Sequence, residues 1–228
     1  MLLNYLYQYF LEEQEFVRRA AIMPDIWLDY LQQGIVPKAS YTVRGGLRSS
    51  SFFGPFLEEK EYRFHQPGHV LWLHQLDRLD ICSEAGARGY FDHRYKAARD
   101  AFFTGPLGQA CLEWQEGLMD RTSDSTRYET WQYFLEGVYG LCTKDGQPET
   151  IFLKQVGVQF IDVVLAEDAP IAGNGHKRDI LCRMVNLLDK VASPFAPHER
   201  ERSSRQRCIV NLRQWLAEGG SLKERMID

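Results

Sequence analysis

Apolar residues recur at intervals of three and four along most of this sequence, and this spacing constrains the fold more than any other feature. The clearest case is the segment 177–192. Its apolar side chains would share one face of a helix: Ile180, Leu181, Met184, Leu187, Leu188 and Val191. Comparable spacing near residues 2–11, 70–79, 91–102 and 107–118 predicts further helices. A chain of 228 residues can bury a core without disulfide or metal support, so we predict a mainly α-helical globular protein.

Two segments depart from the helical pattern. Residues 39–53 (ASYTVRGGLRSSSFF) predict two short strands around a glycine turn. Residues 138–155 place two runs of β-forming residues on either side of Lys144–Gln147, and the Asp-Gly step inside that turn is a strong hairpin signal. We therefore predict one β-hairpin near 138–155.

The N-terminal quarter predicts a helix at 12–21, a tight turn, a second helix at 25–33 and then the strands of 39–53. This order resembles the winged helix-turn-helix modules of the MerR and excisionase families. The resemblance implies a module over residues 1–53, packed on a larger helical domain over 54–228 that carries the hairpin near 138–155. It also implies a DNA-binding regulator, with Lys38, Arg44 and Arg48 as candidate nucleic-acid contacts.

The second predicted helix argues against nucleic acid as the partner. The segment DIWLDYLQQ has no lysine or arginine and carries Asp25 and Asp29, which would face phosphates. A net charge of −4 also argues against broad nonspecific binding of nucleic acid. A noncatalytic protein–protein interaction module is the alternative, supported by Phe52, Phe53 and Phe56 as a possible exposed patch.

Residues 193–216 (SPFAPHERERSSRQRCIVNLRQWL) contain five arginines, four of them before an apolar helical stripe. If the helix begins at Pro197, the stripe extends backward through Arg205 and Arg202 to His198, so these cations would face the interior. Buried arginines must be paired or must line a cavity. One hypothesis is internal pairing with Asp162, Asp189 or other acids.

The other hypothesis is a site for a carboxylate or phosphate ligand at the start of this helix. Its ligand-binding candidates are Arg202, Ser203, Ser204, Arg205 and Lys154, and its candidate acid–base groups are His198 and Glu199. A small anionic metabolite-binding protein, which could be an enzyme, is the function that this hypothesis favours.

The segments YGLC, IFLKQ, LLDKVASPFAPHERERSSR and GIVPKASY resemble a bacterial family of unknown function whose members are sometimes associated with natural-product biosynthesis. That resemblance implies no reaction and no catalytic residue, and it draws attention to His198–Arg205 and Lys154.

The remaining features predict an ordinary cytoplasmic protein. No run of 18 apolar residues is present, and the opening residues lack the basic and small-residue features of a signal peptide. The five cysteines form no CxxC pair. His65, His69 and His74 are interpreted as surface histidines, because His69 and His74 would not share a helix face as metal ligands should. We therefore expect no metal, no cofactor and no membrane partner.

Overall fold

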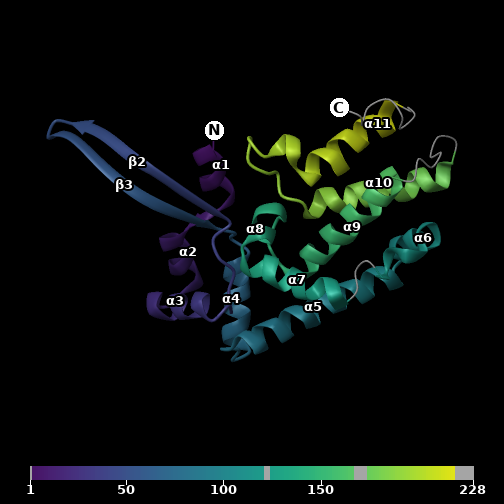
Figure 1. Ribbon diagram of the computed structural model, residues 1–228, viewed down its shortest axis with the longest axis horizontal. Helices are drawn as coiled ribbons and strands as arrows, with labels where there is room; N and C mark the ends of the chain where they lie inside the picture. Colours follow the sequence, from purple (N-terminus) through teal and green to yellow (C-terminus); the bar gives the residue numbers. More distant parts are fainter. Residues whose placement is uncertain (1, 121–123, 167–173, 219–228) are drawn as a thin grey trace.

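The computed structural model describes residues 2–120, 124–166 and 174–218. Helices dominate it, which confirms the mainly α-helical prediction, and three strands form one small antiparallel sheet. In the ribbon view a long β-hairpin projects from one end of the helical body (Figure 1). No helix in these ranges is long and apolar enough to cross a membrane.

The N-terminal elements run helix, short strand, helix, helix, strand, strand. Their bounds are α1 Leu2–Tyr9, β1 Leu11–Glu12, α2 Glu13–Ala20, α3 Pro24–Gln32, β2 Tyr41–Ser51 and β3 Gly54–His65. The sheet order is β1-β3-β2, so the last strand lies in the centre. A three-residue turn joins α2 to α3, and it begins with Ala21 in the left-handed conformation at φ 52°.

The strands at 39–53 differ in position from those predicted. The β2 strand runs straight through Gly45 and Gly46, and the chain reverses at Phe52–Phe53, where Ser51 pairs with Gly54. The return strand β3 was missed because its outer part, residues 55–59, is exposed on both faces, so the sequence there shows no alternation of apolar and polar residues.

The rest of the chain is helical. Its elements are α4 His69–Arg78, α5 Glu84–Thr104, α6 Pro106–Trp114, η1 Glu116–Leu118, α7 Asp124–Leu135, α8 Val138–Cys142, α9 Pro148–Ala166, α10 Gly175–Val191, η3 Arg200–Arg202, η4 Gln206–Asn211 and α11 Leu212–Glu218. Helices α5, α9 and α10 pack side by side, and the segment η4–α11 covers α10 (Figure 1). Gly157 allows a close approach of α9 to α10, since a Cβ there would lie 2.7 Å from the Leu188 side chain.

The prediction of a β-hairpin near 138–155 is wrong. The turn at Asp145–Gly146 exists, but it joins α8 to α9: the Asp145 carboxylate accepts hydrogen bonds from the Gln147 amide (3.0 Å) and the Thr150 hydroxyl (3.0 Å), and Pro148 begins the helix. Burial of one face of α9 outweighs the β-propensity of its residues. Thr143 forms only an isolated bridge, and its partner is Ala192.

One large apolar core runs through both halves of the chain. It includes Phe16, Trp27 and Ile35 from the N-terminal elements together with Trp72 and Phe134 from the helical body. The Trp72 Nε1–H donates a hydrogen bond to the Ile35 carbonyl at 3.2 Å, which ties α4 to the linker before the hairpin. The expected boundary at residue 53 falls in the hairpin turn; the division into two domains stays a prediction.

Candidate functional site

The arginine-rich segment 193–216 does not form the helix start that the sequence predicts. A short 3-10 helix, η3, covers Arg200–Arg202, and the last helix begins at residue 204 instead of Pro197 and continues into the π-helix η4. Ser203 caps this start, since its hydroxyl accepts a hydrogen bond from the Gln206 amide at 3.1 Å. Counting back in threes and fours from the apolar stripe does not reach Arg202, because Arg202 lies in the separate helix η3 and because the π-helix η4 changes the spacing.

The cations of this segment are engaged separately. Arg205 forms an ion pair with Asp189 and donates a hydrogen bond to the Ala192 carbonyl (3.3 Å), and Arg213 binds the other Asp189 oxygen at 2.8 Å. The hydrogen bonds from Arg213 and Arg205 hold the pKa of Asp189 below its usual range against the opposing effect of burial. Arg207 pairs with Asp162, and Arg202 is exposed. The internal-pairing hypothesis therefore accounts for Arg205 and Arg207.

The two candidate acid–base groups, His198 and Glu199, lie in different environments. His198 is 56% exposed, with its Nε2 3.8 Å from Glu199 Oε1. The Glu199 carboxylate accepts a hydrogen bond from the Tyr41 hydroxyl at 2.6 Å, which ties the base of β2 to this segment. Burial and the Glu199 carboxylate raise the pKa of Tyr41 above its usual range.

The other ligand-binding candidates are not drawn together into one site. Ser204 is half-buried at the start of the last helix, and Lys154 is half-buried in the middle of α9. Burial raises the pKa of Cys208 to about 11, an effect that Arg207 and Lys154 partly oppose. Arg205 is directed to Asp189 while Arg202 faces solvent, so the two arginines do not converge on a shared position for an anion.

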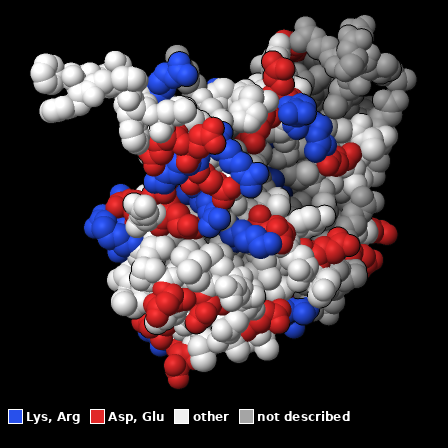
Figure 2. All heavy atoms as spheres, turned by 60° about the vertical axis from the view of Figure 1, so that its left-hand side comes forward, with Lys and Arg blue, Asp and Glu red and all other residues white. Residues whose placement is uncertain are grey.

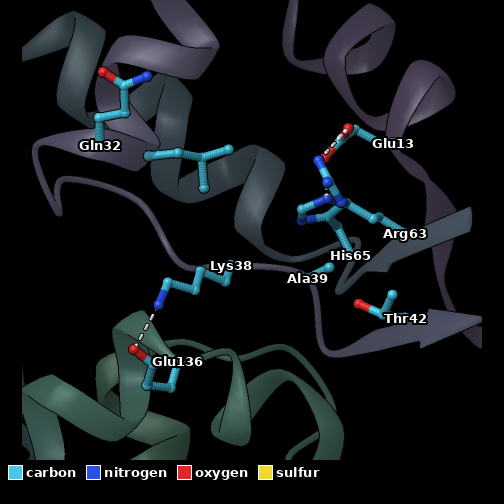
Figure 3. Close-up of a pocket in the computed structure, with 9 residues that line it drawn as sticks. Glu13, Gln32, Lys38, Ala39, Thr42, Arg63, His65 and Glu136 are labelled. Atoms are coloured by element: carbon cyan, nitrogen blue, oxygen red, sulfur yellow. Dashed lines mark hydrogen bonds and ion pairs between the residues drawn. The ribbon is translucent and has the colours of Figure 1, made fainter. Parts of the chain in front are cut away.

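A cleft of about 400 Å³ lies instead between the base of the hairpin and the helical body (Figure 3). Its charged and polar wall is formed by Glu13, Gln32, Lys38, Thr42, Arg63, His65 and Glu136. This volume lies within the range of small-molecule sites in proteins.

Strand pairing assembles one end of the cleft. Leu11 pairs with His65 in the β1–β3 ladder. This pairing places Glu13, at the start of α2, beside the His65 ring. The Glu13 carboxylate lies 3.1 Å from His65 Nε2 and 3.5 Å from Arg63 Nη1. Arg63 and His65 are two residues apart on β3 and so share a face. The hydrogen bond with His65 holds the pKa of Glu13 below its usual range.

The linker between α3 and β2, residues 33–40, and the end of α7 form the opposite end of the cleft. The Lys38 amide donates to the Leu135 carbonyl at 2.8 Å, which fixes the linker against the end of α7. Its ammonium then pairs with Glu136 at 2.7 Å, and Figure 3 shows this pair across the cleft from Glu13, Arg63 and His65.

His65 is part of a fixed support and does not lie free on the surface. Its ring stacks on Phe16 at 4.7 Å and meets the edge of Trp27 at 5.3 Å, and only 1% of the residue is exposed. His69 is also buried, whereas His74 is exposed. The interpretation of all three as surface histidines is wrong for His65 and His69. Within the described residues, no group of three or more His, Cys, Asp or Glu side chains could hold a metal ion.

Sequence patterns did not reveal this cleft, because its residues come from five separate segments and only strand pairing brings them together. A carboxylate hydrogen-bonded to an imidazole can hold and orient a proton. In the described part of the chain the hydrogen-bond partner of the His65 ring is the Glu13 carboxylate, at 3.1 Å from Nε2.

The candidate nucleic-acid contacts lie on or near the hairpin. Lys38 is paired with Glu136, and Arg44 donates to Glu61 at 2.7 Å. Arg48 is exposed on β2, opposite Leu57. Beyond it, residues 49–57, which we call the hairpin tip, carry no charged side chain. Figure 2 shows an uncharged projection standing clear of a body surface where acidic and basic side chains are mixed.

Comparisons with known proteins place most of the helical body in one family. Residues 87–217 match the model of a family of unknown function (DUF6058), whereas the hairpin and the elements before it lie outside the match. No curated protein and no solved structure matches the chain. Since the matched span is more than half of the sequence, the chain belongs to the family of unknown function DUF6058.

Proposed function

We propose that residues 2–65 form a winged helix-turn-helix module that binds another protein, and that the chain acts as a noncatalytic interaction protein. The order of α1, β1, α2, α3, β2 and β3, and the sheet order β1-β3-β2, support this proposal. In such a module α3 occupies the position of a DNA-recognition helix and the β2–β3 hairpin is the wing.

The surface of α3 and its leading turn favours a protein partner over DNA. Met23, Ile26 and Leu28 are 62%, 42% and 51% exposed, and Asp25 and Asp29 lie among them. DNA-binding surfaces instead concentrate lysine and arginine for phosphate contacts. An apolar surface with two carboxylates fits a protein partner that presents apolar and basic side chains.

The single observation that carries the proposal is the hairpin tip. Phe52 and Phe53 are 97% and 94% exposed, and Phe56 and Leu57 are also exposed. An aromatic side chain in water loses the free energy that burial would provide, about 1.5–3 kcal/mol for a phenylalanine. Three exposed aromatic side chains and a leucine at the end of one ribbon are a typical anchor for a protein interface.

The small-anion site expected at the start of the last helix is not part of this proposal, because Arg205 and Arg207 are already paired with Asp189 and Asp162. From the sequence resemblance alone, we also propose a setting in bacterial natural-product biosynthesis.

Selection of peptides from a random library tests the proposal even though the partner is unidentified. We expect wild-type protein to enrich peptides that combine apolar residues with lysine or arginine. Phe52→Ser/Phe53→Ser should raise the dissociation constant of a selected peptide, measured by fluorescence anisotropy, at least tenfold. The matched control is Leu71→Ser on α4, which is 50% exposed and should leave the constant within twofold.

Two results would contradict the proposal. One is a library selection in which no enriched peptide depends on Phe52 and Phe53. The other is binding of mixed-sequence duplex DNA whose affinity falls steeply between 50 and 200 mM salt, on the order of a thousandfold, which would restore a DNA-binding function.

A further inference from the structure

The cleft described above carries two opposite-charge pairs, one at each end (Figure 3). Glu13 and Arg63 lie at one end with His65, and Lys38 and Glu136 lie at the other. Each pair joins segments that are distant in the sequence. The volume of about 400 Å³ leaves room for a small molecule between them.

The charge of the cleft wall selects against a simple anion. With histidine counted as neutral, the two cations Lys38 and Arg63 balance the two carboxylates Glu13 and Glu136. An anion that bound Lys38 or Arg63 would leave the former carboxylate partner without its cation, and a cation would have the converse effect. A molecule that carries both charges can insert into one pair, with its carboxylate on the cation and its ammonium on the carboxylate, so neither side chain loses a partner.

The ion pairs at the two ends can open without a large loss of free energy. The Lys38 and Glu136 side chains are 59% and 57% exposed, and pairs at such positions contribute little to stability. At the other end Arg63 lies 3.5 Å from Glu13 and also bonds to Glu61 at 3.0 Å, so it keeps a carboxylate if Glu13 turns to a ligand. The His65 ring is held by Phe16 and Trp27, which fixes the floor while the charged side chains move.

We propose that this cleft binds a small zwitterion, of the α-amino acid or short-peptide class. The ligand carboxylate is bound by Lys38 and its ammonium by Glu136, and the Glu13–Arg63 pair with His65 forms the opposite end of the site. Leu31 and Ala39 add an apolar wall for a side chain of modest size. The proposal does not depend on the protein-binding function of α3 and the hairpin tip.

Thermal-shift assays with the 20 common L-amino acids at 10 mM, followed by calorimetric titration of the best one, test this site. The best amino acid is then compared with two analogues of the same carbon skeleton, one without the ammonium and one without the carboxylate. We expect the zwitterion to bind at least tenfold more tightly than either analogue.

Variants locate the binding. Lys38→Met/Glu136→Gln should raise the dissociation constant of the best amino acid at least tenfold. If the double variant folds poorly, Lys38→Met alone takes its place. The matched control is Glu15→Gln/Arg18→Met, which removes an exposed ion pair of the same helix as Glu13 but outside the cleft. It should leave the constant within twofold, and any general solute effect on stability should be equal in all variants.

The proposal is overturned by any of three results. Either none of the amino acids shifts the melting temperature, or one analogue binds as tightly as the zwitterion, or Lys38→Met/Glu136→Gln binds like the wild type. These results are independent of peptide selection by the hairpin tip, so failure of one proposal is distinguishable from failure of the other.

Discussion

His69 shows how a single residue type can mislead when only the sequence is read. The ring is buried against Phe134, with centroids 5.6 Å apart, and neither ring nitrogen has a hydrogen-bond partner among the residues that the structure describes. Gly146, at φ 66°, leaves the space that the ring occupies, since a Cβ there would overlap His69 Nε2. Histidine is common both in cores and on surfaces, so the sequence could not separate His69 from the exposed His74.

Burial lowers the pKa of His69 to about 3, well below its ordinary value of 6.5. Between these values the unfolded chain takes up a proton that the folded chain refuses. The stability from neutral His69 is therefore complete above pH 6.5 and is lost as the pH falls toward 3. We expect the unfolding free energy to fall by up to about 1.4 kcal/mol per pH unit across this window from His69 alone.

Urea unfolding at several pH values measures this dependence. His69→Gln should show a shallower slope between pH 6 and 4 than the wild type, whereas His74→Gln, at an exposed position of α4, should keep the wild-type slope. An unchanged slope in His69→Gln would mean that His69 does not control acid sensitivity.

Several helices were predictable from one buried apolar face, although α9 also buries one face and its first turns were predicted as part of a hairpin. In α10 the apolar spacing matches the buried side chains Ile180, Leu181, Met184 and Leu188. The spacing gave no help at the last helix, where a π-helical turn and a start at residue 204 changed which arginines face the body. It also gave none at β3, whose outer part at residues 55–59 is exposed on both faces.

Asp189 on α10 is the residue that holds the last helical segment in place. Its two carboxylate oxygens bind Arg205 and Arg213, which lie on either side of η4. Asp189→Asn should lower the unfolding free energy by about 1–2 kcal/mol, because two guanidinium groups lose a charged acceptor. Denaturant unfolding measures this loss.

Asp179→Asn is the comparison on the same helix. Asp179 is 63% exposed and lies 3.7 Å from Arg183, so its removal should change stability by less than about 0.5 kcal/mol. Equal effects of the two substitutions would show that Asp189 has no special role in stability.

The whole molecule shares one principal core, although its N-terminal elements and helical body look separable in sequence. Phe16 and Trp27 belong to the same apolar cluster as Trp72, Phe91 and Phe134. A second, smaller cluster joins α1 and the hairpin base to Ala196 near the C-terminal segment. Sequence patterns report local periodicity, so they do not reveal that two predicted units share a core.

We expect the full chain to unfold in a single cooperative transition, because the N-terminal elements cannot leave without exposing the shared core. Scanning calorimetry should give equal calorimetric and van't Hoff enthalpies, and tryptophan fluorescence and circular dichroism should report one midpoint. Two separate transitions would instead support independent domains divided near residue 53.

The hairpin has a consequence for how this protein can change over evolution. Its β2 strand has 11 residues, so the tip stands about 35 Å from the base. Because the rings of Phe52 and Phe53 contribute almost nothing to the core, mutation there escapes selection for folding. Only selection for binding a partner would then keep these two positions aromatic. The pattern of substitution at Phe52 and Phe53 among relatives would therefore show whether the binding partner has been retained.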